Sequence, residues 1–304
     1  LHDALPISKG QYEHNLIVFD GESPALLENN KAIMRIKPES GLLNIRFSPG
    51  EKILVDGHDL IGQLERGSKN QNILVLGGKL NVSLRAMNGC LMSMLGQFDP
   101  KEVRIDIANF VNRSNADLFD AIKESSQNIT NSYSGSKYFE TDADMNEWLD
   151  ELIAETNQRL NDLNSTNYYA PRIVVFYQPE NKEVFHQTLI SPRPEKWKMS
   201  EFLEKFLFVL EKGSTVGIHC LLHFLDPDAF FSEFDEDHLT FFGHRVLLQM
   251  TEEDSKRMLG NNRRDAGRLF DPNMKEEHAN NRAIYYNVYS AHYETIKPFE
   301  FYKK

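Results

Sequence analysis

Ile73-Leu74-Val75-Leu76-Gly77-Gly78 is the stretch of this sequence that most strongly determines the expected fold. Its four consecutive apolar residues predict a short strand that is buried on both faces. Two glycines then permit a tight turn, and the apolar residues of 84–95 recur at helical spacing. A buried strand that ends in glycine and leads into a helix is typical of α/β proteins, and of the place where they hold phosphate groups.

The same alternation of strands and helices continues along the chain. Amphipathic helices are expected over residues 142–164 and 200–212. Further apolar runs predict strands at 103–107, 173–177, 217–222, 245–250 and 283–287. Strands that alternate with helices indicate a mostly parallel, doubly wound sheet that is flanked by helices. The Asn/Ser-rich stretch 125–137 is expected to be a loop.

The segment before residue 61 has a different pattern. Short apolar runs at 16–19, 43–47 and 53–55 are each followed closely by Asp-Gly or Pro-Gly, which is typical of strands and turns. We therefore divide the chain into a small β-rich lead-in or linker at 1–60 and one α/β domain at 61–304. Because the chain starts at Leu1 and not at Met, we interpret it as a fragment of a longer protein.

Charge and composition narrow the classes of function. The chain has 34 basic and 45 acidic residues and a net charge of −11. Sequence-independent DNA binding needs clustered Lys and Arg, and this chain has no overall excess of them. A DNA contact would therefore be made by a small part of the chain or by a partner. No apolar run approaches the roughly 18 residues that span a bilayer. Cys90 and Cys220 lie in apolar runs, which favours buried free thiols and a reducing compartment, the cytoplasm.

The loop after the first strand lacks the usual phosphate-binding residues. Such a loop reads G-x-x-x-x-G-K-[ST]: its amides hold the phosphates, its Lys neutralises them and its hydroxyl binds Mg²⁺. The positions concerned in this chain are Gly77, Gly78, Val82, Ser83 and Leu84. The second Gly has become Val, the Lys has become Ser, and the hydroxyl residue has become Leu. Lys79 lies four residues too early. Taken alone, these residues favour a plain strand–turn–helix.

A resemblance elsewhere in the chain reverses that preference. The run Lys212-Gly213-Ser214-Thr215-Val216-Gly217-Ile218-His219 resembles K-G-R-A-V-G-I-H, a segment of the FtsK/SpoIIIE DNA translocases. In that family the segment joins a helix to the strand that carries a polar sensor residue. Weaker resemblances follow in the family's order, at 59–62 (D-I-S-G), 155–160 (E-M-x-x-R-Y), 171–175 (P-Y-I-V-V), 245–260 (R-I…D-S-R-x-I-L) and 265–269 (A-x-x-L-L-G).

The resemblance implies a RecA-like P-loop NTPase fold with nucleotide at the carboxyl ends of the parallel strands, and it shows which positions have changed. The strand at 173–177 should end in Asp-Glu, where Asp orders Mg²⁺ and Glu polarises the attacking water. Here it runs into Gln178 and Pro179, and a shift by one residue offers Glu180 as the Glu but supplies no Asp. The sensor strand should end in T-Q-R-P, and Leu225 and Asp226 replace its Q and R.

Two other groups of polar residues have simpler interpretations. The spacing of His219 and His223 is that of a zinc helix, but the segment predicts a buried strand and lacks the Glu of H-E-x-x-H. We interpret them, and His244, as structural histidines. The acidic, Phe-rich stretch 226–237 favours a solvated loop, with a partner-docking surface as the alternative.

Four arginines are candidates for action on a neighbouring subunit. These are Arg245, Arg263, Arg264 and Arg268, which could act as arginine fingers or as interface residues. Ordinary surface charge is the simpler interpretation of the last three. The first matches an arginine of the family.

Changes in three parts of one reaction centre predict that hydrolysis is lost, because each part normally contributes several powers of ten in rate. We therefore expect a non-hydrolysing FtsK/SpoIIIE-like domain, a structural or regulatory module of a larger ATP-driven DNA or protein translocase. Its partners would be active FtsK-like ATPase domains or subunits in an oligomer, which would supply any DNA contact. No cofactor is expected, and ATP with Mg²⁺ only if a vestigial pocket still binds them. The alternatives are an active DNA translocase with atypical motifs, and a nucleotide-independent DNA- or peptide-binding module.

Overall fold

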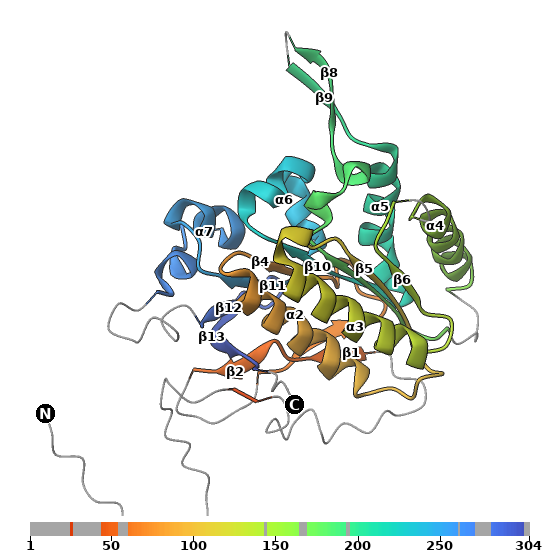
Figure 1. The fold of residues 1–304 in the computed structure, drawn as a ribbon, viewed down its shortest axis with the longest axis horizontal. Coiled ribbons are helices and arrows are strands. Elements are labelled where there is room, and N and C mark those ends of the chain that lie inside the picture. Colours follow the sequence, from red (N-terminus) through yellow and green to blue (C-terminus); the bar gives the residue numbers. More distant parts are fainter. Residues whose placement is uncertain are drawn as a thin grey trace, which may run out of the picture.

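A computed structural model describes residues 25–26, 44–53, 60–142, 145–163, 169–192, 195–260, 262–270 and 281–300. Within these residues one large sheet runs through the molecule with helices on both faces (Figure 1). This confirms the expected α/β class, a mostly parallel sheet flanked by helices. The apolar run at 16–19 lies outside the described residues.

The main sheet has nine strands, and six neighbouring strands in it are parallel. In spatial order the parallel strands are β11 (His244–Leu248), β4 (Ile73–Leu76), β10 (Ile218–Phe224), β7 (Arg172–Tyr177), β5 (Arg104–Asn109) and β6 (Lys137–Phe139). Beyond β11 the sheet continues with antiparallel strands, β12 (Ala283–Asn287), β13 (His292–Pro298) and β2 (Gly50–Lys52). All residues of β4, β7 and β10 are buried, as their apolar sequences predict.

The helices cover the two faces of this sheet and form two apolar cores. One core contains α2 (Leu80–Leu95) and α3 (Ala116–Ser132), which lie in front of the sheet in Figure 1. The other core contains α4 (Met145–Asn161), α5 (Glu201–Lys212), α6 (Pro227–Glu233) and α7 (Glu252–Leu259). Short 3₁₀ helices connect these elements: η2 (Arg113–Asn115), η3 (Pro179–Asn181), η4 (Glu183–Phe185), η5 (Gly213–Val216), η6 (Glu236–Phe241) and η7 (Asp265–Arg268). None of the helices described is long and apolar enough to cross a membrane.

Two small antiparallel pairs complete the fold. Strand β1 (Asn44–Phe47) pairs with β3 (Gly62–Glu65) and packs against the core that contains α2. A ribbon of β8 (Thr188–Pro192) and β9 (Glu195–Lys198) stands away from the body of the molecule (Figure 1). It was not expected from the sequence.

The expectation of a loop at 125–137 is wrong, because α3 continues to Ser132. The buried face of that helix consists of Phe119, Ile122, Ser126 and Thr130. Two of these four are polar, so the apolar periodicity fades in the second half of the helix although the spacing is still helical. Thr130 satisfies its hydroxyl within the helix by donating to the Ser126 carbonyl at 3.0 Å.

A buried carboxylate on β5 connects β5 to β7, α4 and β6. Asp106 and Arg172 both have side chains that are 1% exposed, and Arg172 Nη2 lies 2.5 Å from Asp106 Oδ2. The same carboxylate accepts hydrogen bonds from Trp148 Nε1 at 2.9 Å and from the Lys137 amide at 3.2 Å. Arg172 also bonds to Glu155 on α4. With both charges withdrawn from water, each depends on the other for stabilisation.

Candidate functional site

The parallel strands place a candidate ligand site at the carboxyl ends of β4 and β10. These strands are neighbours, but the chain leaves β4 toward β5 on one side and leaves β10 toward β11 on the other. In open α/β sheets, ligands bind where the connections diverge in this way. The residues that follow β4, β7 and β10 are the positions that the sequence comparison singled out.

The turn from β4 into α2 is short and tight. β4 ends at Leu76 and α2 begins at Leu80, so two of the four variable positions of a phosphate loop lie in the helix. Gly77 and Gly78 have positive φ angles of 92° and 74°. The Gly78 amide donates to the carbonyl of Gln249, just after β11, at 3.1 Å. One of the amides that would hold phosphate is therefore already bonded within the protein.

The first turns of α2 bring the next three candidate positions into the core. Val82 and Leu84 are each 5% exposed, and Ser83 is fully buried. Ser83 Oγ donates to the Leu80 carbonyl at 3.0 Å and lies 2.8 Å from His223 Nε2. Since the hydroxyl proton is already used, the imidazole N–H is the donor in the second contact. A buried polar link between α2 and β10 thus involves Ser83, the residue that the sequence analysis aligned with the phosphate-loop lysine.

His223 was predicted to be structural, and its surroundings agree. Burial in β10 lowers its pKa to about 3, so the ring is neutral. Its Nδ1 is buried and has no hydrogen-bond partner among the described residues. Its place in a run of apolar residues was the sequence signal that this histidine is buried.

The end of β7 turns sharply and carries a carboxyl with an altered pKa. Gln178 adopts a left-handed conformation with φ 51°, and Pro179 begins η3. The Glu180 side chain then reaches the end of β10, where its Oε1 accepts a hydrogen bond from the Leu225 amide at 3.0 Å. Burial raises the pKa of Glu180 to about 7, and Asp226 and Glu233 add smaller contributions in the same direction. The structure therefore brings together the end of β7 and the end of β10.

The end of β10 supplies a helix cap. The Asp226 side chain accepts from the Ala229 amide at 2.7 Å at the N-terminus of α6, and Leu225 is 39% exposed. Glu233, at the last position of α6, is 5% exposed and has a pKa that burial raises. Sequence reasoning did not place Glu233 here, because its link to this edge depends on where α6 ends.

These residues do not fit ATP with Mg²⁺. Ser83 is buried and hydrogen-bonded to His223, and Leu84 has no hydroxyl that could bind Mg²⁺. Glu180 and Asp226 lie after β7 and β10, but no Asp directly follows β7. Lys79 is the cation of the loop and is exposed at the N-terminus of α2. Phosphoryl transfer requires a bound metal and several fixed cations around the phosphates, and this edge offers carboxyls in their place.

The candidate arginines have different surroundings. Arg245 is 7% exposed and donates to the carbonyls of Leu239, Phe242 and Met258, so we assign it a structural role within this domain. The arginines near η7 lie at the surface, each with a partner. Arg264 and Arg268 both bond to Glu252, and the Arg263 guanidinium lies 4.1 Å from the centre of the Tyr293 ring.

The two other histidines that were predicted to be structural are bound to neighbouring groups. His219 Nδ1 lies 2.8 Å from the Gln71 carbonyl, and His244 Nδ1 lies 2.9 Å from the Tyr285 hydroxyl. Burial lowers the pKa of both to about 4. No group of three or more His, Cys, Asp or Glu within the described ranges could hold a metal ion. Cys90 and Cys220 are buried free thiols.

Comparison with known proteins shows similarity at the level of the fold. No family model matches the chain, and no curated protein matches it. EssC (ATPases 2 and 3) from Geobacillus thermodenitrificans has a similar structure, with a TM-score of 0.56 and 13% identity. EccC (ATPases 2 and 3) from Thermomonospora curvata, in complex with a signal sequence peptide, gives 0.54 and 10%. The cytoplasmic domain of the type VII secretion ATPase EccC from the same organism gives 0.50 and 14%.

The coverage of these matches is unequal. The matches include 89%, 88% and 89% of this chain, but only 48%, 44% and 30% of the EssC, EccC peptide-complex and EccC cytoplasmic-domain chains. The chain thus spans less than half of the length of each. At this level of identity the likeness shows the fold of these ATPase domains, and the fold alone.

Proposed function

We propose that this chain is a non-hydrolysing domain of the FtsK/SpoIIIE type, a structural or regulatory module of a larger translocase that moves DNA or protein. The observation that carries the proposal is the buried Ser83–His223 contact. Ser83 is the residue aligned with the phosphate-loop lysine, and its neutral, buried hydrogen bond supports a loss of phosphate binding. The shared fold with ATPase domains that belong to multi-domain proteins supports the modular role.

The proposed partners are active ATPase domains or subunits of the same type. A domain that keeps the fold but has lost the phosphate-binding residues can still pack against active copies. The exposed arginines near η7 are available for such packing, because ion pairs at the surface exchange partners at low cost. DNA contact is assigned to the assembly, since the net charge of −11 disfavours binding by this chain alone. The buried free thiols are consistent with a cytoplasmic location.

The purified chain is expected to show no ATP turnover above background and no rise in melting temperature with millimolar MgATP. A nucleotide that binds only the folded state stabilises it according to its concentration relative to its Kd, by about 2.7 kcal/mol at 100 times Kd. The measurements are phosphate release and thermal unfolding with and without MgATP. A known ATPase measured in the same assay verifies that turnover would be detected.

Ser83→Ala and Gln178→Ala serve as matched variants in both assays. If the proposal is right, neither variant changes a rate that is already at background. ATP turnover by the unmodified chain that either substitution abolishes would contradict the proposal and favour an active ATPase with atypical motifs. A melting temperature that rises with MgATP, without turnover, would instead indicate a domain that binds nucleotide but does not hydrolyse it.

A further inference from the structure

Strand β6 forms an outer edge of the main sheet. It is the last strand in the spatial order, and it pairs on one side with β5 in parallel. No other strand of the described chain lies along its second side. The free edge of such a strand presents backbone N–H and C=O groups that can pair with another extended chain.

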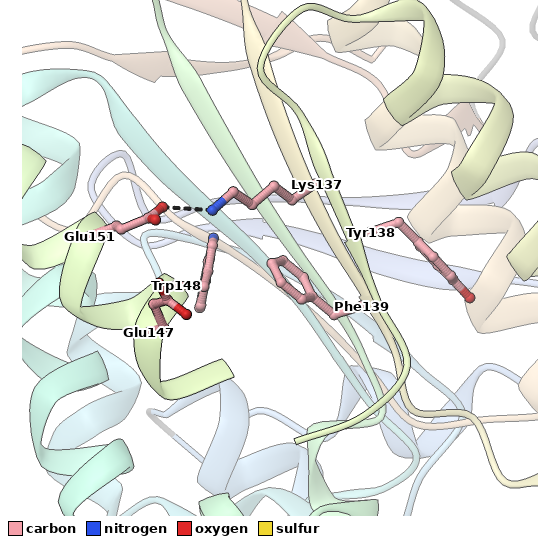
Figure 2. A pocket seen from close by; sticks show the side chains of 6 residues that line it. All are labelled: Lys137, Tyr138, Phe139, Glu147, Trp148 and Glu151. Atoms are coloured by element: carbon pink, nitrogen blue, oxygen red, sulfur yellow. Dashed lines mark hydrogen bonds and ion pairs between the residues drawn. The ribbon is translucent and has the colours of Figure 1, made fainter. Parts of the chain in front are cut away.

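A groove lies directly beside this edge. It has a volume of about 390 Å³ and is lined by Lys137, Tyr138 and Phe139 of β6 and by Glu147, Trp148 and Glu151 of α4. Figure 2 shows the Lys137 side chain directed toward α4 and the Phe139 ring facing Trp148, while Tyr138 points the other way. This volume is at the small end for a ligand pocket, so it suits a single large side chain.

The floor of the groove is aromatic and fixed in place. The Phe139 and Trp148 rings have their centroids 5.5 Å apart. Asp106 accepts from the Trp148 indole with one carboxylate oxygen and from the Lys137 amide with the other, and so holds both walls of the groove. Trp148 is 2% exposed and Phe139 is 8% exposed, so both rings are already held in place, and an incoming side chain meets only the small part of each ring that reaches the groove.

The rim of the groove has an excess of negative charge. Glu147 and Glu151 are one helical turn apart on α4 and both are exposed. Lys137 Nζ lies 2.6 Å from Glu151 Oε2. Within the described residues Glu147 has no ion-pair partner, so two negative charges face one positive charge. A basic side chain at this rim would balance the second negative charge. The net negative charge of the whole protein also attracts basic segments.

We propose that the groove between β6 and α4 binds an extended peptide segment of another protein as an added strand beside β6. The segment carries a large apolar side chain that packs on Phe139 and Trp148, and a Lys or Arg that pairs with Glu147 and Glu151. Alternate residues of a strand face the same side, so the apolar and the basic residue are two positions apart. This inference does not depend on the state of the nucleotide site.

The proposal can be tested with an array of synthetic seven-residue peptides of sequence Ser-Thr-X-Thr-Z-Thr-Ser, in which X and Z each vary over all twenty amino acids. The fluorescently labelled chain is expected to prefer Phe, Trp, Leu or Ile at one varied position and Lys or Arg at the other. The best peptide is then measured by fluorescence anisotropy. Bound peptide should protect from hydrogen exchange those amides of β6 that face away from β5, because strand pairing covers that edge.

Two variants and one modified peptide decide the result. Glu147→Lys combined with Glu151→Lys is expected to weaken binding about ten-fold, while Glu204→Lys, an exposed glutamate on α5, leaves it unchanged. N-methylation of the peptide amides that face β6 should abolish binding, because it removes the N–H donors that pair with this edge.

Three outcomes would overturn the proposal. The first is an array without any sequence preference. The second is binding that is insensitive to both the charge reversal and N-methylation. The third is protection from exchange that lies away from β6, or that appears without peptide in a dimer of this chain, which would make a second copy the occupant of the edge.

Discussion

Replacing Asp106 with Ala is expected to lower the free energy of unfolding by about 3–5 kcal/mol. The substitution leaves the buried Arg172 guanidinium without its fully buried counter-charge and with only Glu155, which is partly exposed. It also removes the acceptor of the Trp148 indole and of the Lys137 amide, and an unsatisfied buried donor costs about 1–3 kcal/mol. Urea unfolding followed by tryptophan fluorescence measures the change directly, because Trp148 is part of the network.

Two comparisons separate the buried network from a general effect of charge. Asp150→Ala removes a surface partner of Lys205 and should cost less than about 1 kcal/mol. The double change Asp106→Leu with Arg172→Met removes both members of the buried pair and should recover part of the loss. A cost below about 1 kcal/mol for Asp106→Ala alone would mean that the network does not hold β5, β7 and α4 together.

Glu180→Gln is expected to stabilise the protein at pH 8 by about 2 kcal/mol and to have little effect at pH 5. The pKa of Glu180 is raised to about 7 in the folded protein. Between the usual glutamate range and pH 7 the folded state therefore holds a proton that the unfolded state has released. Stability contributed by this group falls as pH rises through that window, and the full penalty applies above pH 7. Gln keeps the oxygen that accepts from the Leu225 amide.

The measurement is the free energy of unfolding from pH 5 to pH 8 for both proteins. Glu233 also has a raised pKa, and His186 lies 3.8 Å from it. Both residues are present in the two proteins, so the difference between the two curves reports Glu180 together with its electrostatic interaction with Glu233. Glu183→Gln changes a nearby exposed glutamate and should give no pH-dependent difference. Parallel curves for Glu180→Gln and the unmodified chain would show that the Glu180 carboxyl is ionised normally.

The sequence predicted the parallel core well, because its signals are local. β4 and β7 are continuous apolar runs, and α4 and α5 have clear amphipathic spacing, so each was found within a few residues. Strand β6 has only three residues, too few for any periodicity. The ribbon of β8 and β9 pairs with no other strand of the described sheets, and the buried face of α3 includes the polar residues Ser126 and Thr130, which obscure its apolar spacing.

The candidate site was predicted in part. Counting positions from the phosphate-loop motif selected Ser83, and counting from the end of the strand at 173–177 selected Glu180. The residues that they contact belong to or follow another strand. That Ser83 contacts His223 depends on the pairing of β4 with β10, and that Glu180 reaches Leu225 depends on the sharp turn at Gln178. The groove beside β6 could not be predicted, since Trp148 looks like any core residue of a helix until β6 is placed next to it.

The pairing of β2 with β13 has a consequence for synthesis. Lys52 pairs with Ile296, so β2 can join the sheet only after β13, which lies far along the chain, has left the ribosome. Contacts this distant in sequence slow folding, and unpaired edges in a nascent chain are prone to aggregation. The parallel core can assemble once β11 has emerged, whereas the antiparallel strands β12, β13 and β2 can be added only after β13 has been made. A chain that stops before β12 would therefore leave one side of β11 unpaired. That edge could then pair with an extended segment of another chain.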